Sequence, residues 1–201
     1  MPQFLLATLL TALLTLTGCS SLISHDPAPP PPVGSWSEHQ QQMTHLTHWE
    51  LSGKIGIRSP DENQSANLFW RQQDQVYAIE MTGPLGQGGA RITGQPGNIK
   101  ISVAGEGDFR AGSPEELLQD TLGWSVPVEQ FQWWVRGLPA PSSPFRQQIS
   151  NNRLSELVQD GWHVRYLRYK EHVPYTLPGK IRLSRDTLSI TLIIKEWTPL
   201  H

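Results

Sequence analysis

The chain has 201 residues, with 16 Lys and Arg, 18 Asp and Glu, and a formal net charge of −2. That balance lacks the broad basic field of nucleic-acid-binding domains, so nucleic acid is not expected as a partner. A single cysteine cannot form an internal disulfide, so the core must be held together by packing. With 17 Gly, 17 Pro and 8 Trp, the composition favours short strands and turns over long helices.

The N-terminal segment joins an apolar run, Phe4 to Leu16, to Leu16-Thr17-Gly18-Cys19. A cleaved secretory peptide needs an apolar segment followed by small residues at the cut. The tetrapeptide resembles the lipobox of bacterial lipoproteins. This resemblance implies a diacylglycerol on the Cys19 thiol, cleavage before Cys19 and an acyl group on its new amino group. The alternatives are an ordinary signal peptide with a chance cysteine and a short anchor, although a spanning helix needs ~20 apolar residues.

We therefore expect residues 1–18 to be a lipoprotein signal peptide and residues 19–34 to be a lipidated, proline-rich tether. The segment from Asp26 to Pro32 cannot form a helix or a central strand, so it is expected to be an extended spacer. By the same resemblance, Ser20 after the lipidated residue implies export to the outer membrane, with the protein anchored by lipid and facing the periplasm. Residues 35–201 suffice for a single domain with a sizeable core.

The segment after the tether is expected to be a helix that is capped by Ser35 or Ser37 and runs to about Thr47. His45 and His48 are spaced i, i+3, which is compatible with metal binding. No nearby cysteine or carboxylate completes a set of ligands, so we interpret this as a solvated helix face and expect no metal.

Repeated alternation of apolar and polar residues follows, and it predicts an antiparallel meander with one apolar face. Gln95-Pro96-Gly97-Asn98 has the composition of a tight turn between two of these strands. The apolar positions of the alternating segments are Leu51, Gly53, Ile55, Ile57, Ala66, Leu68, Trp70, Tyr77, Ile79, Met81, Ile99, Ile101 and Val103.

Two helices interrupt the strands. Ser113-Pro114 followed by two glutamates is typical of a helix start, and Gly123 ends this helix. Pro127 and Glu129 begin a second helix that ends at Gly137. Both have an apolar side, which must cover the open side of the sheet. Further strands are predicted at residues 154–159, 162–169, 181–183 and 188–194, with residues 195–201 as a short tail.

The middle of the chain contains three short motifs in a set order: Gly83-Pro84-Leu85-Gly86, Gly94-Gln95-Pro96-Gly97-Asn98 and Trp133-Trp134-Val135-Arg136-Gly137-Leu138-Pro139. Together with the lipobox and the helix pair, they resemble the LolB family of outer-membrane lipoprotein receptors. The resemblance covers nearly all of the mature chain. It implies a mainly β fold, an incomplete antiparallel barrel of about eleven strands with a helical lid over an apolar cavity.

The same resemblance implies a function without covalent catalysis. A monomeric receptor takes cargo lipoproteins from the soluble periplasmic carrier LolA and inserts them into the inner leaflet of the outer membrane, where it meets phospholipid. The residues themselves give no sign of an enzyme, because the chain has no Gly-x-Ser-x-Gly elbow and no P-loop lysine after its glycine-rich segment. No catalytic residue and no cofactor are expected beyond the lipid on Cys19.

A carrier of acyl chains needs an apolar pocket, because an acyl chain in water costs about 0.8 kcal/mol per exposed methylene. The alternating pattern is equally compatible with a solid core, and a membrane-tethered binder of another hydrophobic ligand is the alternative function. The Trp residues at 124, 133 and 134 are interpreted as packing within the lid, with lipid binding as the alternative. The residues expected to line the cavity are Leu51, Ile55, Leu68, Trp70, Ile79, Ile101, Trp134, Ile190 and Leu192.

Leu85 lies in a glycine-rich connection between two predicted strands, flanked by Pro84 and Gly86. The turn explains the glycines and the proline, but it gives no reason for a leucine. A side chain folded back on the sheet, or an isolated surface leucine, would be unremarkable. The family resemblance instead implies a protruding loop that inserts into the membrane and aids release of the cargo.

Overall fold

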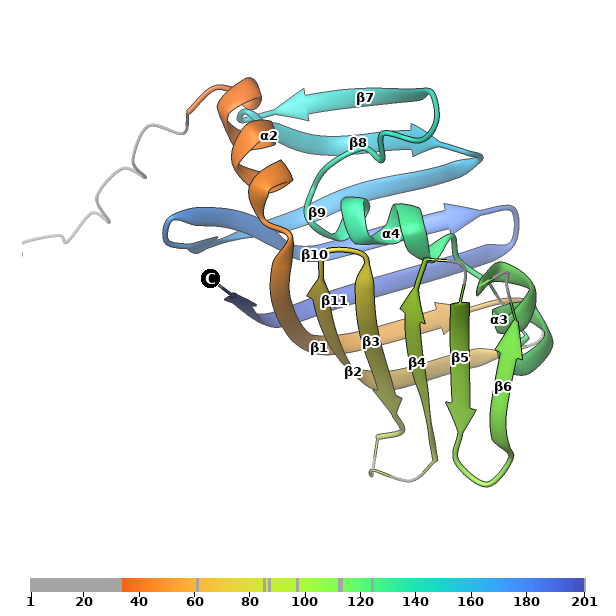
Figure 1. Cartoon of the computed structure of the whole chain (residues 1–201). Coiled ribbons are helices and arrows are strands. Elements are labelled where there is room, and N and C mark those ends of the chain that lie inside the picture. The colour runs from red at the N-terminus through yellow and green to blue at the C-terminus, as the bar shows by residue number, and fades with distance from the viewer. Residues whose placement is uncertain are drawn as a thin grey trace, which may run out of the picture. The chain divides into compact units, whose positions relative to one another are not determined.

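The computed structural model describes residues 34–200, apart from residues 61, 85, 87, 97, 112, 113 and 124 (Figure 1). They belong to one compact unit, residues 33–201. The signal peptide, Cys19 and almost all of the expected tether lie outside the described residues, as do Leu85 and Trp124. What the sequence predicts for them therefore stays a prediction.

Eleven strands form one antiparallel sheet in the order β6-β5-β4-β3-β2-β1-β11-β10-β9-β8-β7. The sheet is open, with β6 and β7 at its edges, and this confirms the expected incomplete barrel. The strands are β1 (His48–Arg58), β2 (Asn63–Gln73), β3 (Val76–Thr82), β4 (Gly89–Gln95), β5 (Asn98–Val103), β6 (Gly107–Ala111), β7 (Phe145–Ser150), β8 (Arg153–Gln159), β9 (Trp162–His172), β10 (Tyr175–Arg185) and β11 (Leu188–Pro199).

The alternation in the sequence sets which side of each strand faces the core. In β1, Leu51, Ile55 and Ile57 are buried, while Lys54 and Arg58 point to solvent. Ile55 lies opposite Leu192 of β11, so one apolar face continues from strand to strand. Because the side-chain period of a strand is two, a slip of one residue would reverse both faces, and this register is therefore strongly specified.

Each of the three described helices has a recognisable start. Helix α2 (Trp36–His45) begins with a capping box, in which the Glu38 amide donates to the Ser35 hydroxyl over 3.3 Å and the Ser35 amide donates to the Glu38 carboxylate over 2.7 Å. Helix α3 (Pro114–Leu122) begins at a proline, and α4 (Val128–Val135) follows one. Gly137, at φ +83°, then allows the chain to turn away from α4.

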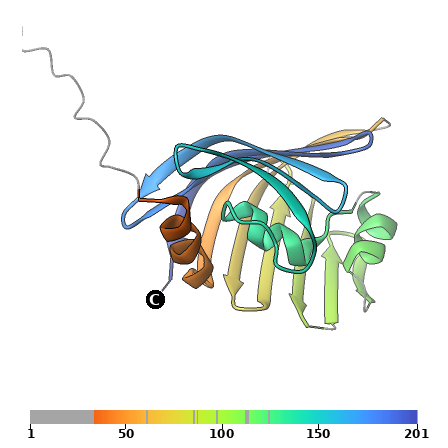
Figure 2. The same cartoon turned by 90° about the horizontal axis from the view of Figure 1, so that it is seen from above.

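The helices lie on the concave side of the curved sheet, as Figure 2 shows for α2 and α4. Helix α4 buries Val128, Phe131, Trp134 and Val135 against the sheet, which confirms the prediction that the helix pair covers the open apolar side. None of the helices in the described part of the chain is long and apolar enough to cross a membrane.

The sequence analysis missed strands β6 and β7 and ended β11 too early. All side chains of β7 are exposed, so this edge strand has no apolar alternation to detect. Residues 195–199 continue β11 instead of forming a tail. A bulge between Ser52 and Gly53 places Trp197 opposite Leu51 and Ile194 opposite Gly53. This irregularity breaks the period of two on which the prediction rested.

Candidate functional site

A small apolar void lies between the concave face of the sheet and the two lid helices. Its volume is about 20 Å³, which is little more than one water molecule requires. All of its lining side chains are apolar. They are Ile55, Leu68, Trp70, Ile79, Met81 and Ile92 from strands β1 to β4, and Leu118, Val126, Val128 and Phe131 from α3, α4 and the segment between them.

The structure places the expected cavity residues in the core and divides them into two groups. Ile55, Leu68, Trp70 and Ile79 line the void. The other five, namely Leu51, Ile101, Trp134, Ile190 and Leu192, are fully buried in the same core cluster but do not border the void. Around these described residues the interior is closely packed, and the assignment of the nine to an acyl-chain cavity stays a prediction.

The sequence analysis did not assign the remaining wall residues to the site. Met81 lies on β3 opposite Ala90, and Ile92 lies on β4 opposite Ile79. The strand β4 carries a usable signal, since the buried Ile92 and Gly94 alternate with polar residues that are exposed or half-buried. Leu118 and Phe131 belong to the apolar stripes of the helices, and those stripes were recognised as packing surfaces but not as walls of a site.

Helix α4 is fixed to the C-terminal strands by a buried hydrogen-bond network around Gln159. The Trp134 indole donates to the Gln159 side-chain oxygen over 2.8 Å, and the Ala140 amide donates to the same oxygen over 3.0 Å. The Gln159 amide donates in turn to the Ala140 carbonyl over 2.7 Å. The Tyr166 hydroxyl donates to the Trp134 carbonyl over 2.9 Å. Because all of these groups are buried, loss of one partner leaves another unsatisfied.

Arg136 joins α4 to the junction of α2 and β1. It is buried, and its guanidinium donates to the carbonyls of Met43 and Leu46 over 3.1 and 2.8 Å and stacks on Trp133 at 4.5 Å. Burial lowers the pKa of Arg136 to about 10, so it stays charged at neutral pH. The second tryptophan of the Trp133-Trp134 pair thus packs in the core, while the first holds the arginine.

Among the described side chains of helix α3, the buried ones are Leu117 and Leu118. The helix packs on β5 and β6, the edge of the sheet. Burial of a leucine contributes about 1.5–3 kcal/mol, and another apolar group of similar shape could replace that contact. The wall of the void formed by α3 is therefore the one that a ligand's hydrocarbon could take over.

A larger and more polar cleft of about 450 Å³ lies on the other side of α4, beside the β2–β3 and β4–β5 turns. Its lining includes Gln72, Asp74, Glu129, Trp133 and Arg136. A cleft with this many hydrogen-bonding groups is a poor site for hydrocarbon, since polar groups that lose water without gaining a partner cost free energy. The void below the helices is the better candidate for an apolar ligand.

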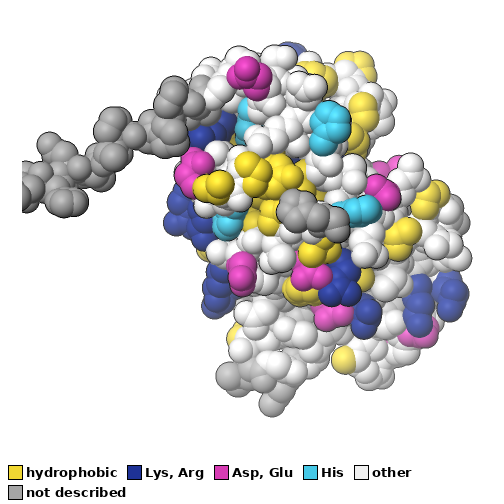
Figure 3. Space-filling model, turned by 60° about the vertical axis from the view of Figure 1, so that its left-hand side comes forward, with side chains coloured by type: hydrophobic (Ala, Val, Ile, Leu, Met, Phe, Trp, Pro, Cys, Tyr) yellow, Lys and Arg dark blue, Asp and Glu magenta, His cyan; other side chains and the backbone are white. Residues whose placement is uncertain are grey.

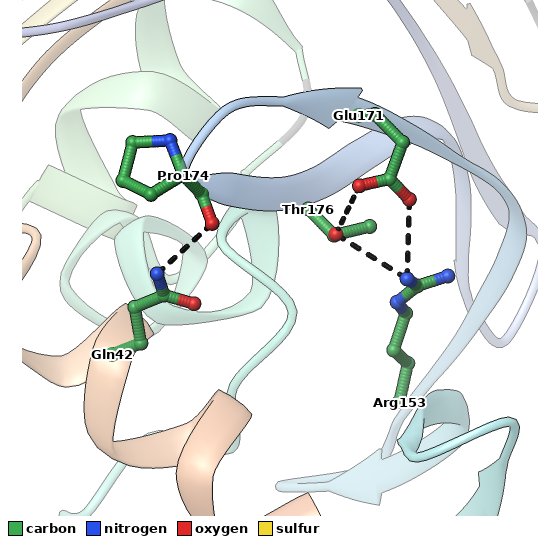
Figure 4. Close-up of polar contacts among 5 residues, drawn as sticks. All are labelled: Gln42, Arg153, Glu171, Pro174 and Thr176. Carbon is green, nitrogen blue, oxygen red and sulfur yellow. Dashed lines mark hydrogen bonds and ion pairs between the residues drawn. The ribbon is translucent and has the colours of Figure 1, made fainter. Parts of the chain in front are cut away.

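The end of the barrel beside α2 is closed by polar contacts between segments far apart in the sequence (Figure 4). The Gln42 side chain donates to the Pro174 carbonyl over 3.0 Å. Across the β9–β10 hairpin, the Arg153 guanidinium lies 3.2 Å from Glu171 and 3.3 Å from the Thr176 hydroxyl. The Gln42 bond fixes α2 to the hairpin, and the Arg153 contacts tie the start of β8 to both strands of the hairpin.

His39 of α2 is buried in this end of the barrel, next to Trp36 and edge-on to Tyr169. Burial, and secondarily the Arg153 charge, lower the pKa of His39 to about 4. The imidazole is therefore neutral at neutral pH. His45 and His48 do not meet at a metal site. Their ring nitrogens bond to the Gln41 carbonyl and to Asp74, and the described residues contain no group of three potential metal ligands.

The β3–β4 connection lies at the end of the sheet away from α4 (Figure 1). Its predicted turn is present, since the Gly86 amide donates to the Gly83 carbonyl over 2.9 Å and Gly86 has φ +73°. Pro84 and Gly86 are exposed. Leu85 occupies the position between them, outside the described residues.

An open, strongly curved antiparallel sheet with helices on its concave face defines a class of protein found among solved structures. A DUF1329 family protein from Desulfovibrio piger has this fold, with a TM-score of 0.55, 7% identity and coverage of 84% of this chain and 93% of that one. A LolA superfamily protein from Nitrosomonas europaea has a TM-score of 0.53, 10% identity and coverage of 84% and 95%. At such low identity, the likeness establishes the fold alone.

The sequence comparisons give the particular family. The family model "Outer membrane lipoprotein LolB" matches residues 47–197. The outer-membrane lipoprotein LolB of Stutzerimonas stutzeri is 48% identical over 188 residues, which cover 92% of this chain and 91% of that protein. That of Pseudomonas aeruginosa is 44% identical over 191 residues, with coverage of 94% and 93%. The chain belongs to the LolB family, as the sequence motifs predicted.

Proposed function

We propose that this protein receives lipoproteins from a soluble periplasmic carrier of the LolA type and inserts them into the inner leaflet of the outer membrane. The observation that carries the proposal is the apolar void under α3 and α4, within a chain of the LolB family. Acyl chains of the cargo bind there reversibly. No bond is made or broken, so the protein is a receptor and not an enzyme.

The void of about 20 Å³ is too small for an acyl chain, so cargo enters only when the lid moves. Helix α3 is the wall expected to move, because apolar contacts of Leu117 and Leu118 hold it against the sheet edge. Helix α4 stays in place through the Gln159 network. When α3 moves away, an acyl chain replaces the apolar contacts that the helix made with the core. The free-energy difference between the closed, empty state and the open, loaded state therefore stays small.

The lipid on Cys19 anchors the protein in the outer membrane, facing the periplasm. The lipid consists of an S-diacylglycerol and an N-acyl group, as the lipobox implies. Mass spectrometry of the mature chain tests this directly. A mature protein without acyl groups on Cys19 would contradict the anchoring.

Transfer of cargo from the carrier is tested with Leu118→Gln, which places a polar group in the wall of the void. Ile149→Gln is the matched control, because Ile149 is 38% exposed on the edge strand β7 and does not border the void. The purified proteins are mixed with radiolabelled lipoprotein on its carrier. The Leu118 variant should lose acceptance at least tenfold and bind a fluorescent fatty-acyl probe weakly, while the control behaves like the wild type. A folded Leu118 variant with undiminished acceptance would place the acyl site elsewhere.

Delivery to the membrane is assigned to the β3–β4 loop, with Leu85 inserted into lipid. A leucine contributes ~1.5–3 kcal/mol on burial, which is enough to bias a release step but not to anchor a protein. Leu85→Glu should still accept lipoprotein from the carrier, whereas its delivery to liposomes should fall sharply. Leu85→Met should be tolerated. Normal delivery by the Glu variant would leave Leu85 as an ordinary loop residue.

A further inference from the structure

The outer, convex face of strands β1, β11, β10 and β9 carries a row of side chains that crosses all four strands. Lys54 lies opposite Ile193, Ile193 opposite Lys180, and Lys180 opposite Arg168. Side chains paired directly across an antiparallel sheet have their Cβ atoms about 4.5–5.5 Å apart. Three cations therefore lie in one line across the sheet.

A second row lies two residues away on β11 and β10, and three residues away on β9, where the pairing with β10 has an irregularity at Lys180. In it Thr191 lies opposite Arg182, and Arg182 lies opposite Arg165. The two rows thus contain two directly opposed pairs of like charge, Lys180 with Arg168 and Arg182 with Arg165. Such pairs destabilise a sheet, so the requirements of folding do not explain them.

Carboxylates are nearly absent from these rows. Glu156 approaches Arg165 at 3.4 Å. Lys54, Arg168, Lys180 and Arg182 form no ion pair with any described residue. The chain as a whole has a net charge of −2, so the excess of positive charge is local. Lys and Arg side chains also gather along the left-hand edge of the space-filling view (Figure 3).

Three cations elsewhere on the outer face do form ion pairs across neighbouring strands. On β2, β4 and β5, Arg71 lies 2.6 Å from Glu50, Arg91 lies 3.3 Å from Glu80, and Lys100 lies 2.6 Å from Asp108. Each of these cations has a carboxylate on an adjacent strand. On the other four strands, among the residues described, Arg165 alone of the cations in the two rows has such a partner.

We propose that Lys54, Arg165, Arg168, Lys180 and Arg182, here called the cationic face, bind the anionic phospholipid headgroups of a membrane surface. Lys and Arg near a membrane attract anionic lipid, and guanidinium groups match phosphate in bidentate geometry. Ile193, 36% exposed within the first row, and Leu167, 41% exposed beside it, provide apolar groups that can enter the headgroup layer.

The distribution of side chains favours a membrane over an acidic protein partner. Protein interfaces depend on a few aromatic or arginine anchors in well-packed central pockets. The two rows contain no aromatic side chain, and neither the apolar void nor the polar cleft borders them. An array of cations on a broad face instead suits many equivalent headgroups.

The test uses the full chain bound to vesicles, with a fluorescent amino acid in place of Thr191 at the centre of the cationic face. The matched control has the same amino acid in place of Thr93, a half-buried threonine on the outer face of β4. The vesicles are phosphatidylcholine, with or without phosphatidylglycerol, and carry nitroxide-headgroup lipid as the quencher. Quenching at position 191 should rise at least threefold with phosphatidylglycerol and vanish at high ionic strength, while quenching at position 93 stays low.

Reversing four charges, with Lys54→Glu, Arg168→Glu, Lys180→Glu and Arg182→Glu, should abolish the response at position 191. If that variant does not fold, Lys180→Gln with Arg182→Gln should weaken the response about fivefold or more per charge. Quenching that does not depend on phosphatidylglycerol, or that survives charge reversal, would overturn the proposal. Protection of position 191 by the carrier protein on phosphatidylcholine vesicles would overturn it too and assign the face to a protein. None of these results depends on lipoprotein transfer.

Discussion

The two halves of the barrel meet the lid helices through different proportions of polar and apolar contact. In the C-terminal half, β7 to β11 are tied to α4 by the buried hydrogen bonds of Gln159 and Tyr166, and to α2 by Gln42. In the N-terminal half, Gln72 of β2 donates a hydrogen bond to Gln132 of α4, but β1 to β4 border an apolar void under the lid, and the described buried side chains of α3 are leucines. Directional bonds permit one arrangement, whereas apolar contacts accept substitutes. The C-terminal half is therefore suited to be a rigid frame, and the N-terminal half is suited to accommodate a ligand.

The largest effect is expected for Trp134→Ala in the frame. Trp134 is fully buried, and its indole donates to Gln159. The substitution removes a large core side chain and leaves the Gln159 oxygen with one partner fewer. Loss of about 3–5 kcal/mol of unfolding free energy should follow, measured by urea denaturation. A loss below about 1 kcal/mol would show that α4 is not fixed as described.

Acidification should weaken the frame at the α2 end, through His39. Burial lowers the folded-state pKa of His39 from its ordinary value of 6.5 to about 4, so the unfolded chain binds more protons between these two values. Stability is therefore complete above about pH 6.5 and falls as the pH drops toward 4, by at most about 3 kcal/mol. Urea denaturation at several pH values measures this. His39→Phe should remove most of the dependence, and an unchanged dependence would assign it to other groups.

A smaller loss is expected for Gln159→Leu, which keeps the volume but deletes the centre of the network. The Trp134 indole and both polar groups of the Ala140 backbone then lose their partners. Unsatisfied buried groups cost about 1–3 kcal/mol each, and relaxation of the segment limits the total to about 2–3 kcal/mol. Gln148→Leu on the exposed strand β7 is the control and should change stability by less than about 0.5 kcal/mol. Equal effects would remove the special role of Gln159.

The smallest loss of stability is expected in the accommodating half, for Leu118→Ala. Because α3 packs on the edge of the sheet, it can settle into part of the space, and about 2 kcal/mol should be lost, the low end for a buried leucine. The enlarged void should also bind small apolar molecules more tightly than the wild type does, as apolar cavities do. Calorimetry with benzene tests this second effect. A loss as large as that of Trp134→Ala, without benzene binding, would erase the distinction between the halves.

Much of the fold was predictable from the sequence, because burial on one face of a sheet imposes a period of two. The alternation at residues 51–57 and 77–81 gave strands, and Ser35, Pro114 and Pro127 gave the helix starts. A strand without a buried face could not be predicted in this way, and β7 is such a strand because all of its side chains are exposed. The bulge at Ser52 and Gly53 also hid the end of β11, since it displaces Trp197 from the expected alternation.

The candidate site was predictable only in part. Ile55, Leu68, Trp70 and Ile79 were expected to line a cavity, and they do border the void. Periodicity could not distinguish them from Ile190 and Leu192, which point to the same face but pack solidly. That distinction depends on where the lid helices rest, which is a property of tertiary packing and not of strand period. The Gln159 network could not be predicted either, because it depends on tertiary packing that brings together residues distant in sequence.

The pairing of β1 with β11 has a consequence for the order in which the protein can be completed. The first and last strands of the sheet lie side by side at its centre, with Trp49 opposite Pro199. During synthesis or export, β1 to β6 and β7 to β10 can form as two separate local meanders of hairpins. They become one sheet only when the last strand is available, and closing so long a loop is entropically slow. A chain that is stopped before residue 188 should therefore hold two unjoined pieces with exposed strand edges, which is a state that exposes it to aggregation.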